Sequence, residues 1–340
     1  MEHNKRKVMV RMMGLLLAVM MLAGVSVDST VLAAMKRTAK SKDEVVQALY
    51  DANKQQEKKL VIQYKGKDVK KVWKNITTYL WYDVTEMDDG DDSTDADYMM
   101  ANADVYHKNS FLKSGNRIIC NLKYYEKTSQ TKKVDARIAK LIQSEGWSEL
   151  SDYQKAKKVH DWILQETEYD ERKKIPAVSS AAYGVLFHGK VICNGYAMAY
   201  YKIMTELDVP CKIVFGFAGE EGISHAWNLV KLDGKWYHVD CTWDDSDDEE
   251  SCTDYFLVGS KQISKDHVFD EEQVTSDFLK KYQINKGNYK VSDDDCDDDC
   301  DDFDDDWDDD WDDDWDDDWD DDWDDDWDDD WDDIEDAFDF

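Results

Sequence analysis

A single cysteine stands where the sequence predicts that a helix begins. In the stretch GKVICNGYAMAYYKIM (189–204), Cys193 is followed by small and aromatic residues and then by Ile203 and Met204 at helical spacing. The first N–H groups of a helix carry partial positive charge, which favours a thiolate, and the thiolate is the nucleophilic form of cysteine. A cysteine alone is more often a buried packing residue. A catalytic interpretation of Cys193 therefore needs a base and a partner for that base.

A hairpin further along the chain supplies both groups. Two runs rich in β-forming residues flank Asp233 and Gly234, and an Asp-Gly pair between such runs is a strong signal for a two-residue turn. In that register Leu232 pairs with Lys235. The sequence therefore predicts an antiparallel hairpin whose pairing can be extended residue by residue.

Extending this register places a histidine beside an aspartate. Asp240 falls opposite Trp227, and His225 lies on the same face, diagonal to Asp240. Diagonal neighbours in a ladder are about 7–8 Å apart at the backbone, which lets an imidazole and a carboxylate meet. A slip of one residue would put them on opposite faces. His238 shares the face and is a rival imidazole, for which we predict a packing or supporting role.

These three groups suit nucleophilic acyl chemistry. Cys193 would be the nucleophile, His225 the general base and then the general acid, and Asp240 the group that orients the imidazole. The backbone N–H of Cys193 is a natural oxyanion donor at a helix start. A second donor is needed, for which Tyr183 and His188 in the preceding segment are the candidates.

Several blocks of this sequence resemble those of the transglutaminase-like superfamily, in its bacterial secreted branch. They are SDYQKAKKVHDWILQETEYD, YGVLFHGKVICNGYAMAYYKIM, SHAWNLV and GKWYHVDCTWDD. The resemblance spans about 151–260 and implies an α+β, papain-related fold, with a cysteine-bearing helix packed on an antiparallel sheet. It implies acyl transfer through a thioester, as in transglutaminases, cysteine peptidases and peptide N-glycanases. The family's nucleophile, histidine and aspartate fall on Cys193, His225 and Asp240.

Helices and strands around the blocks would position these residues. Helical spacing covers 134–146, ending on a glycine, and 151–170, with Ser151 as the N-cap. Residues 180–190 are expected to form a loop that leads to Cys193, and 211–219 a buried strand. These elements set a predicted catalytic domain over 129–290.

The region 35–128 is predicted to be a small α/β segment, and it lies outside the part that resembles the transglutaminase-like superfamily. It contains a helix at 43–56, a strand candidate beginning at Lys59, and helical spacing over 69–83. Two further strands are separated by the turn Ser-Gly-Asn at 114–116. Nothing in this segment's composition assigns it a role.

The N-terminus has the pattern of a secretory signal peptide. A basic start is followed by a short apolar run and small residues near Ala33, so 1–33 is predicted to be removed on export. We expect a secreted or cell-surface protein without a stable membrane span after cleavage. Seven cysteines leave at least one thiol unpaired within a monomer.

The acidity of the chain is concentrated in its C-terminal tail. The net charge is −36, but 34 acidic residues lie between Asp293 and Phe340, and the rest of the chain has 44 acidic against 42 basic residues. No basic patch supports nucleic-acid binding. The Asp/Trp repeat of 293–340 cannot bury a core and is predicted to be disordered. Cys296 and Cys300 have no nearby histidine and make a poor zinc signature.

Two functions therefore remain open. The first is exported, thiol-dependent acyl transfer on protein or peptide amides, as a peptidase or a transglutaminase, with no required cofactor. The second is a non-catalytic surface or scaffold module. In either case the tail could solvate the protein, dock on a basic or cell-wall surface, or bind Ca²⁺ through its carboxylates.

Overall fold

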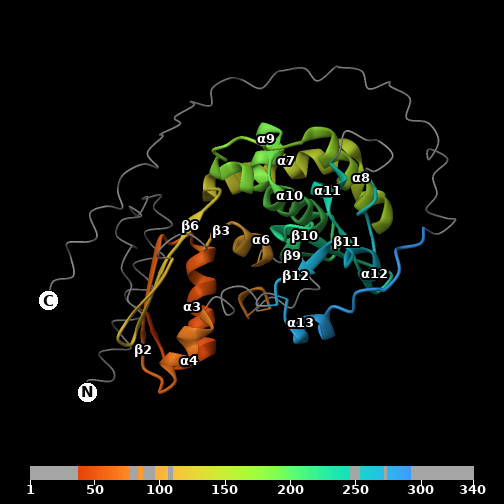
Figure 1. The fold of residues 1–340 in the computed structure, drawn as a ribbon. Coiled ribbons are helices and arrows are strands. Elements are labelled where there is room, and N and C mark those ends of the chain that lie inside the picture. The colour runs from red at the N-terminus through yellow and green to blue at the C-terminus, as the bar shows by residue number, and fades with distance from the viewer. Residues whose placement is uncertain are drawn as a thin grey trace, which may run out of the picture. The chain divides into compact units, whose positions relative to one another are not determined.

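The computed structural model describes residues 37–76, 83–86, 96–105, 110–245, 253–271 and 274–291 (Figure 1). They belong to one compact unit that ends at Asp295. The predicted signal peptide (1–33) and the acidic tail (293–340) lie outside the described residues. Within the described residues, no helix is long and apolar enough to cross a membrane.

A four-stranded antiparallel sheet carries the predicted hairpin. Its strand order is β11-β10-β9-β12, with β9 at Cys211–Ala218, β10 at Ile223–Leu232, β11 at Lys235–Val239 and β12 at His267–Phe269. Leu232 pairs with Lys235, as predicted. Asp233 and Gly234 have φ angles of +50° and +75°. Positive φ at both positions is what a two-residue hairpin turn requires, so the Asp-Gly pair fixes the register.

The predicted cysteine-bearing helix packs against this sheet. Helix α10 spans Cys193–Glu206 and is buried along almost its whole length. The side chain of Asn228 on β10 donates to the carbonyl of Ala197 at 3.0 Å, which ties the helix to the middle of the sheet. Because α10 has small residues in its first two turns, its backbone can approach the strands closely.

Two longer helices precede α10. The structure confirms the glycine predicted to end the first and the serine predicted to cap the start of the second. Helix α7 spans Thr128–Glu145 and stops at Gly146, whose φ is +66°. Helix α8 spans Asp152–Glu166 and begins with a capping box, in which Ser151 and Gln154 bond each other's backbone. The α7 helix starts earlier than the sequence pattern indicated.

The expected loop at 180–190 is wrong. Residues Ala182–His188 form helix α9, followed by β8 (Lys190–Val191), which pairs in parallel with β7 (Glu168–Tyr169). Gly184 explains the difference. A Cβ at this position would lie 2.5 Å from the carbonyl oxygen of Val178 and 2.6 Å from Val191, so the glycine allows a close approach and does not break the helix.

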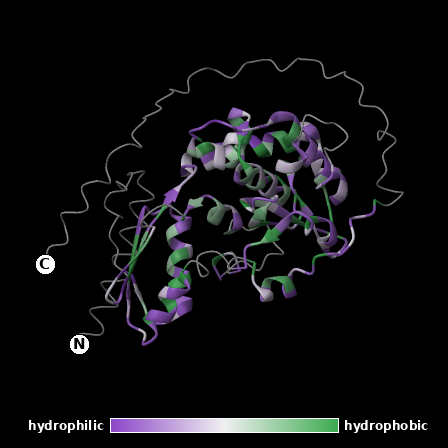
Figure 2. Cartoon of the chain, in the orientation of Figure 1, coloured by the Kyte–Doolittle hydropathy of each residue, from purple (hydrophilic) through white to green (hydrophobic). Residues whose placement is uncertain are grey.

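The N-terminal segment forms a separate sheet with order β1-β2-β5-β4. The strands are β1 (Arg37–Ala39), β2 (Lys59–Tyr64), β4 (Phe111–Ser114) and β5 (Arg117–Asn121). Helix α3 (Lys42–Lys54) packs near it, and Figure 2 shows hydrophobic and hydrophilic residues alternating around this helix. The two strands flanking 114–116 pair as predicted. Helix α4 (Val69–Lys74) covers the first part of the helical pattern at 69–83, and residues 77–82 lie outside the described residues.

Short elements complete the described chain and connect its parts. They are α6 (Ala96–Ala101), β3 (Ala103–Asp104), β6 (Lys123–Tyr124), α11 (Cys241–Asp244), α12 (Ser260–Ile263) and α13 (Ser276–Lys281), with single 3₁₀ turns at Trp147–Glu149 and Ala177–Ser180. Asp97 on α6 is buried, pairs with Lys212 of β9 at 2.5 Å, and accepts the N–H of Ile213 at 3.0 Å. The carbonyl of Ala101 accepts the side chain of Asn194 at 3.0 Å. The N-terminal segment thus contacts both β9 and the first turn of α10.

Candidate active site

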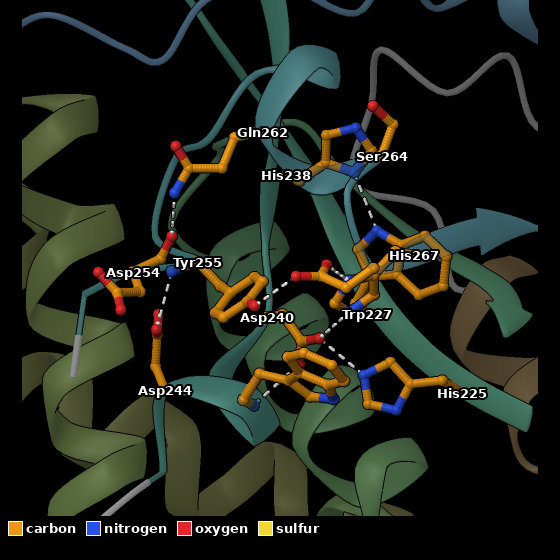
Figure 3. Close-up of polar contacts among 12 residues, drawn as sticks. His225, Trp227, His238, Asp240, Asp244, Asp254, Tyr255, Gln262, Ser264 and His267 are labelled. Atoms are coloured by element: carbon orange, nitrogen blue, oxygen red, sulfur yellow. Dashed lines mark hydrogen bonds and ion pairs between the residues drawn. The ribbon is translucent and has the colours of Figure 1, made fainter. Parts of the chain in front are cut away.

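The predicted histidine and aspartate are in direct contact. His225 lies on β10, and Asp240 follows the last residue of β11 (Figure 3). The Nε2 atom of His225 is 2.6 Å from Oδ2 of Asp240. Both side chains are buried, with 7% and 1% exposed. The register of the hairpin therefore brings these two groups together as the sequence analysis predicted.

The carboxylate of Asp240 accepts hydrogen bonds on both oxygens. As the N-cap of α11, its Oδ1 accepts the backbone N–H groups of Thr242 at 3.1 Å and Trp243 at 3.4 Å. Its Oδ2 accepts from His225 and from a second histidine, His267, at 2.9 Å. Burial raises the pKa of Asp240, but the two histidines more than offset this effect and hold the pKa well below its usual range. Asp240 is therefore a fixed anion at neutral pH.

Cys193 is the first residue of α10, and it neighbours the imidazole of His225, whose pKa it raises. Since Nε2 of His225 is bonded to Asp240, Nδ1 is the ring nitrogen left to exchange a proton with the thiol. Among the cysteines in the described part of the chain, Cys193 is partly exposed, whereas Cys120, Cys211 and Cys241 are buried. Of the four cysteines in the described residues, the one beside the imidazole is thus also the most exposed.

The electrostatics favour a charged imidazole. Burial lowers the pKa of His225, but the charge and hydrogen bond of Asp240, together with the contact to Cys193, raise it to about 10. His225 stacks on Trp227 with ring centroids 5.9 Å apart and lies 6.2 Å from Trp243. These rings surround the imidazole with apolar surface, which strengthens its interaction with Asp240. The arrangement can hold a charged imidazole beside Cys193.

A family model matches part of this chain. Residues 142–241, which include Cys193, His225 and Asp240, match the family model described as the transglutaminase-like superfamily. This segment of the chain belongs to the transglutaminase-like superfamily. The predicted resemblance and the mixed helix-and-sheet fold are therefore confirmed.

The individual relatives are less than 30% identical to this chain. Kyphoscoliosis peptidase of Mus musculus is 29% identical over 33% of this chain and 20% of its own length. Kyphoscoliosis peptidase of Homo sapiens is 28% identical over 34% of this chain and 20% of its own length. The chain thus spans about a fifth of these curated relatives. A solved structure described as a TGase is 16% identical, covers 63% of this chain and 60% of that one, and gives a TM-score of 0.32.

The rival histidine of the transglutaminase-like core is neutral and packed. Trp227 donates from Nε1 to Nδ1 of His238 at 2.9 Å. Burial, and then the neighbouring His267, lower the pKa of His238 to about 3. This matches the packing role predicted for it. Cys241 is buried in the core of the protein, as its place on the opposite face indicated.

The candidates for a second oxyanion donor both lie on α9. The backbone N–H of Tyr183 donates to Glu126 at 3.2 Å, its ring stacks on Phe187 at 4.5 Å, and the ring of His188 lies 5.4 Å from it. Their oxyanion role stays a prediction. Tyr169 is a further residue near the site, and its pKa is raised first by burial and then by the nearby Cys193. The only indication in the sequence was its place at the end of the helix-bearing block.

His225, Asp240 and His267 also form a group that could hold a metal ion, with ligand atoms all within 4.8 Å of one another. The 2.6 Å between His225 and Asp240 is shorter than the separation of about 3.3 Å between two ligands of a tetrahedral zinc with bonds of about 2.0 Å. Hydrogen bonding therefore accounts for the cluster. The expectation that no cofactor is required stays a prediction.

Proposed function

We propose that this protein is a thiol-dependent acyltransferase that acts on protein or peptide amides through Cys193, His225 and Asp240. One observation carries the proposal. The imidazole of His225 is bonded to the buried carboxylate of Asp240 and neighbours Cys193, and against the effect of burial these two groups raise its pKa to about 10. A cysteine, a histidine and an orienting carboxylate in this order are the groups that covalent acyl chemistry needs.

The groups act in sequence on one amide. The Sγ atom of Cys193, having given its proton to His225, attacks the carbonyl carbon of the substrate. The backbone N–H of Cys193 at the start of α10 stabilises the oxyanion. His225 then returns the proton to the nitrogen of the leaving amine, the C–N bond breaks, and the acyl group remains on Cys193 as a thioester. Water or a second amine, deprotonated by His225, releases it.

Hydrolysis is the outcome that we favour. The curated relatives are named as peptidases, and they are similar to about a third of this chain. The triad itself serves either acceptor, because water and an amine attack the same thioester. A peptidase therefore remains to be distinguished from a transglutaminase by its products.

One assay follows both products together. Purified protein is incubated with dimethylated casein, whose lysines are blocked, and with dansylcadaverine. New amino termini report peptide-bond hydrolysis, and dansyl fluorescence in the protein band reports transfer to the amine. We expect new amino termini from the wild type and neither product from Cys193→Ala.

A buried cysteine provides the matched control. Cys120→Ala removes a thiol from β5 in the N-terminal sheet and should retain activity. Products that persist in Cys193→Ala, or that disappear equally in both variants, would contradict the proposed function.

A further inference from the structure

A second histidine is bonded to the aspartate of the candidate triad. His267 on β12 places its Nε2 atom 2.9 Å from Oδ2 of Asp240, the same oxygen that accepts from His225 (Figure 3). The side chain of His267 is 1% exposed. One carboxylate oxygen is therefore shared between two buried imidazoles.

The Nδ1 atom of His267 is also bonded to a carboxylate. Its Nδ1 atom lies 2.5 Å from Oδ1 of Asp266, and the hydroxyl of Tyr255 donates to Oδ2 of Asp266 at 2.7 Å. The ring packs 4.6 Å from Trp243 and 5.2 Å from Trp227. A continuous chain of contacts thus runs from Tyr255 through Asp266 and His267 to Asp240.

A glycine makes this approach possible. Gly216 of β9 pairs with His225 on one side and with Phe269 on the other. A Cβ at Gly216 would lie 2.1 Å from the carbonyl oxygen of Val268 and 2.8 Å from the ring of Trp227. A side chain there would push β12 away from β9 and displace the ring of Trp227. The absence of a side chain at Gly216 therefore lets His267 and His225 meet on one carboxylate.

We propose that His267 is a positioning residue for the proposed acyl transfer, and that it takes a share of Asp240 Oδ2 and so limits how tightly Asp240 holds the protonated His225. An acceptor divided between two donors binds each less strongly than it would bind one alone. A general acid must give up its proton to the leaving amine, and an imidazolium bound too tightly is a poor acid. This inference rests on the proposed function, because it assigns His267 to the same proton transfer.

The groups around His267 define what else acts on it. Asp240 and Asp266 supply negative charge, His225 and Tyr255 are titratable neighbours at ring distances of 5.4 Å, and His238 acts on it from β11. His238 is neutral near pH 7. The two carboxylates therefore dominate the environment of His267.

Two substitutions separate the contacts of His267. In His267→Gln the side-chain amide can replace Nε2 and still donate to Asp240. In His267→Asn the shorter amide takes the place of Nδ1 and leaves Oδ2 of Asp240 to His225 alone. The matched control is His238→Asn, which changes a buried histidine of the same sheet and preserves an acceptor for Trp227.

The measurement is the titration of His225, followed by NMR of protein labelled with ¹⁵N and ¹³C histidine and assigned with His225→Gln. We expect His267→Asn to raise the pKa of His225 by about one pH unit, a tenfold change in its acid dissociation constant. His267→Gln should move it by less than about a third of that, and His238→Asn should leave it unchanged. A merely structural role for His267 would give no such pattern.

The results that would overturn the inference are equally definite. They are a His225 titration that stays in place or falls in His267→Asn, or a shift of the same size in His238→Asn. If His267→Asn does not fold, the wild type still decides, since its ¹⁵N spectrum must show a hydrogen on Nε2 of both His225 and His267. Iodoacetamide labelling of Cys193 in the same samples tests the proposed function separately, because Cys193 can be reactive whether or not His267 acts on Asp240.

Discussion

Replacing Asp240 by asparagine removes the charge behind the imidazole while keeping the shape of the side chain. The pKa of His225 is raised from 6.5 to about 10, mainly by the charge and hydrogen bond of Asp240 acting against burial. In Asp240→Asn, burial opposes only the contact to Cys193. We therefore expect the pKa of His225 to fall by about 3 pH units, to about 7.

The size of this change can be expressed as a free energy. At about 1.4 kcal/mol per pH unit, a fall of about 3 units corresponds to about 4 kcal/mol of lost stabilisation of the imidazolium. An asparagine at position 240 can also donate to Nε2 of His225, which would place the ring hydrogen on Nδ1, facing the thiol. His225 would then hold the wrong tautomer to accept a proton from Cys193.

The assay is a histidine NMR titration of the wild type and Asp240→Asn between pH 5 and 11. Asp97→Asn is the matched control, because Asp97 is a buried carboxylate in an ion pair with Lys212 of the same sheet. We expect the control to lose stability and to leave the titration of His225 unchanged. A His225 pKa above about 9 in Asp240→Asn would refute the claim that Asp240 sets its charge.

Three further predictions concern stability and geometry. His160 is buried between Asp161 and Asp244, each 3.0 Å from a ring nitrogen; burial lowers its pKa, but the two carboxylates raise it overall. A raised pKa stabilises the fold below pH 6.5, and this stabilisation is lost as the pH rises through the pKa of His160 in the folded protein. In urea unfolding, His160→Gln should lower the free energy of unfolding by about 3 kcal/mol at pH 6 and by less at pH 9. An equal loss at both pH values would count against this prediction. Gly216→Ala should destabilise the protein by about 2–3 kcal/mol and slow the labelling of Cys193, because the added Cβ would meet the backbone of β12. A melting temperature equal to that of the wild type would contradict the close packing. Asn194→Ala should cost about 2 kcal/mol in thermal unfolding, since it leaves the carbonyls of Ala101 and Ser180 without the amide that donates to them, and no loss would argue against that bond.

Local signals in the sequence were sufficient to predict the turns and helix ends, which depend on residues close together in the chain. The Asp233-Gly234 turn adopts positive φ at both residues, so the pairing across the hairpin could be counted outward to His225 and Asp240. Ser151 caps α8, and Gly146 ends α7, because capping depends on neighbouring residues alone. These positions needed no knowledge of the rest of the chain.

Other parts depend on contacts between distant segments. His267 is 27 residues beyond Asp240, on a strand of three residues that has no periodic pattern of its own. Its place follows from pairing with β9 and from the space left by Gly216. The helix at Ala182–His188 was missed because Gly184 disfavours an isolated helix and is required only once Val178 and Val191 pack against it. Long-range packing of this kind leaves no local signature.

The central claim is that His225 activates Cys193, and selective alkylation tests it most directly. The wild type and His225→Ala are treated briefly with iodoacetamide at pH 5, and the modified cysteines are mapped by mass spectrometry. The account predicts rapid modification of Cys193 in the wild type, a loss of at least tenfold in His225→Ala, and little modification of the buried Cys120, Cys211 and Cys241 in either protein. Equal labelling of Cys193 in the two proteins, or none in the wild type, would contradict it.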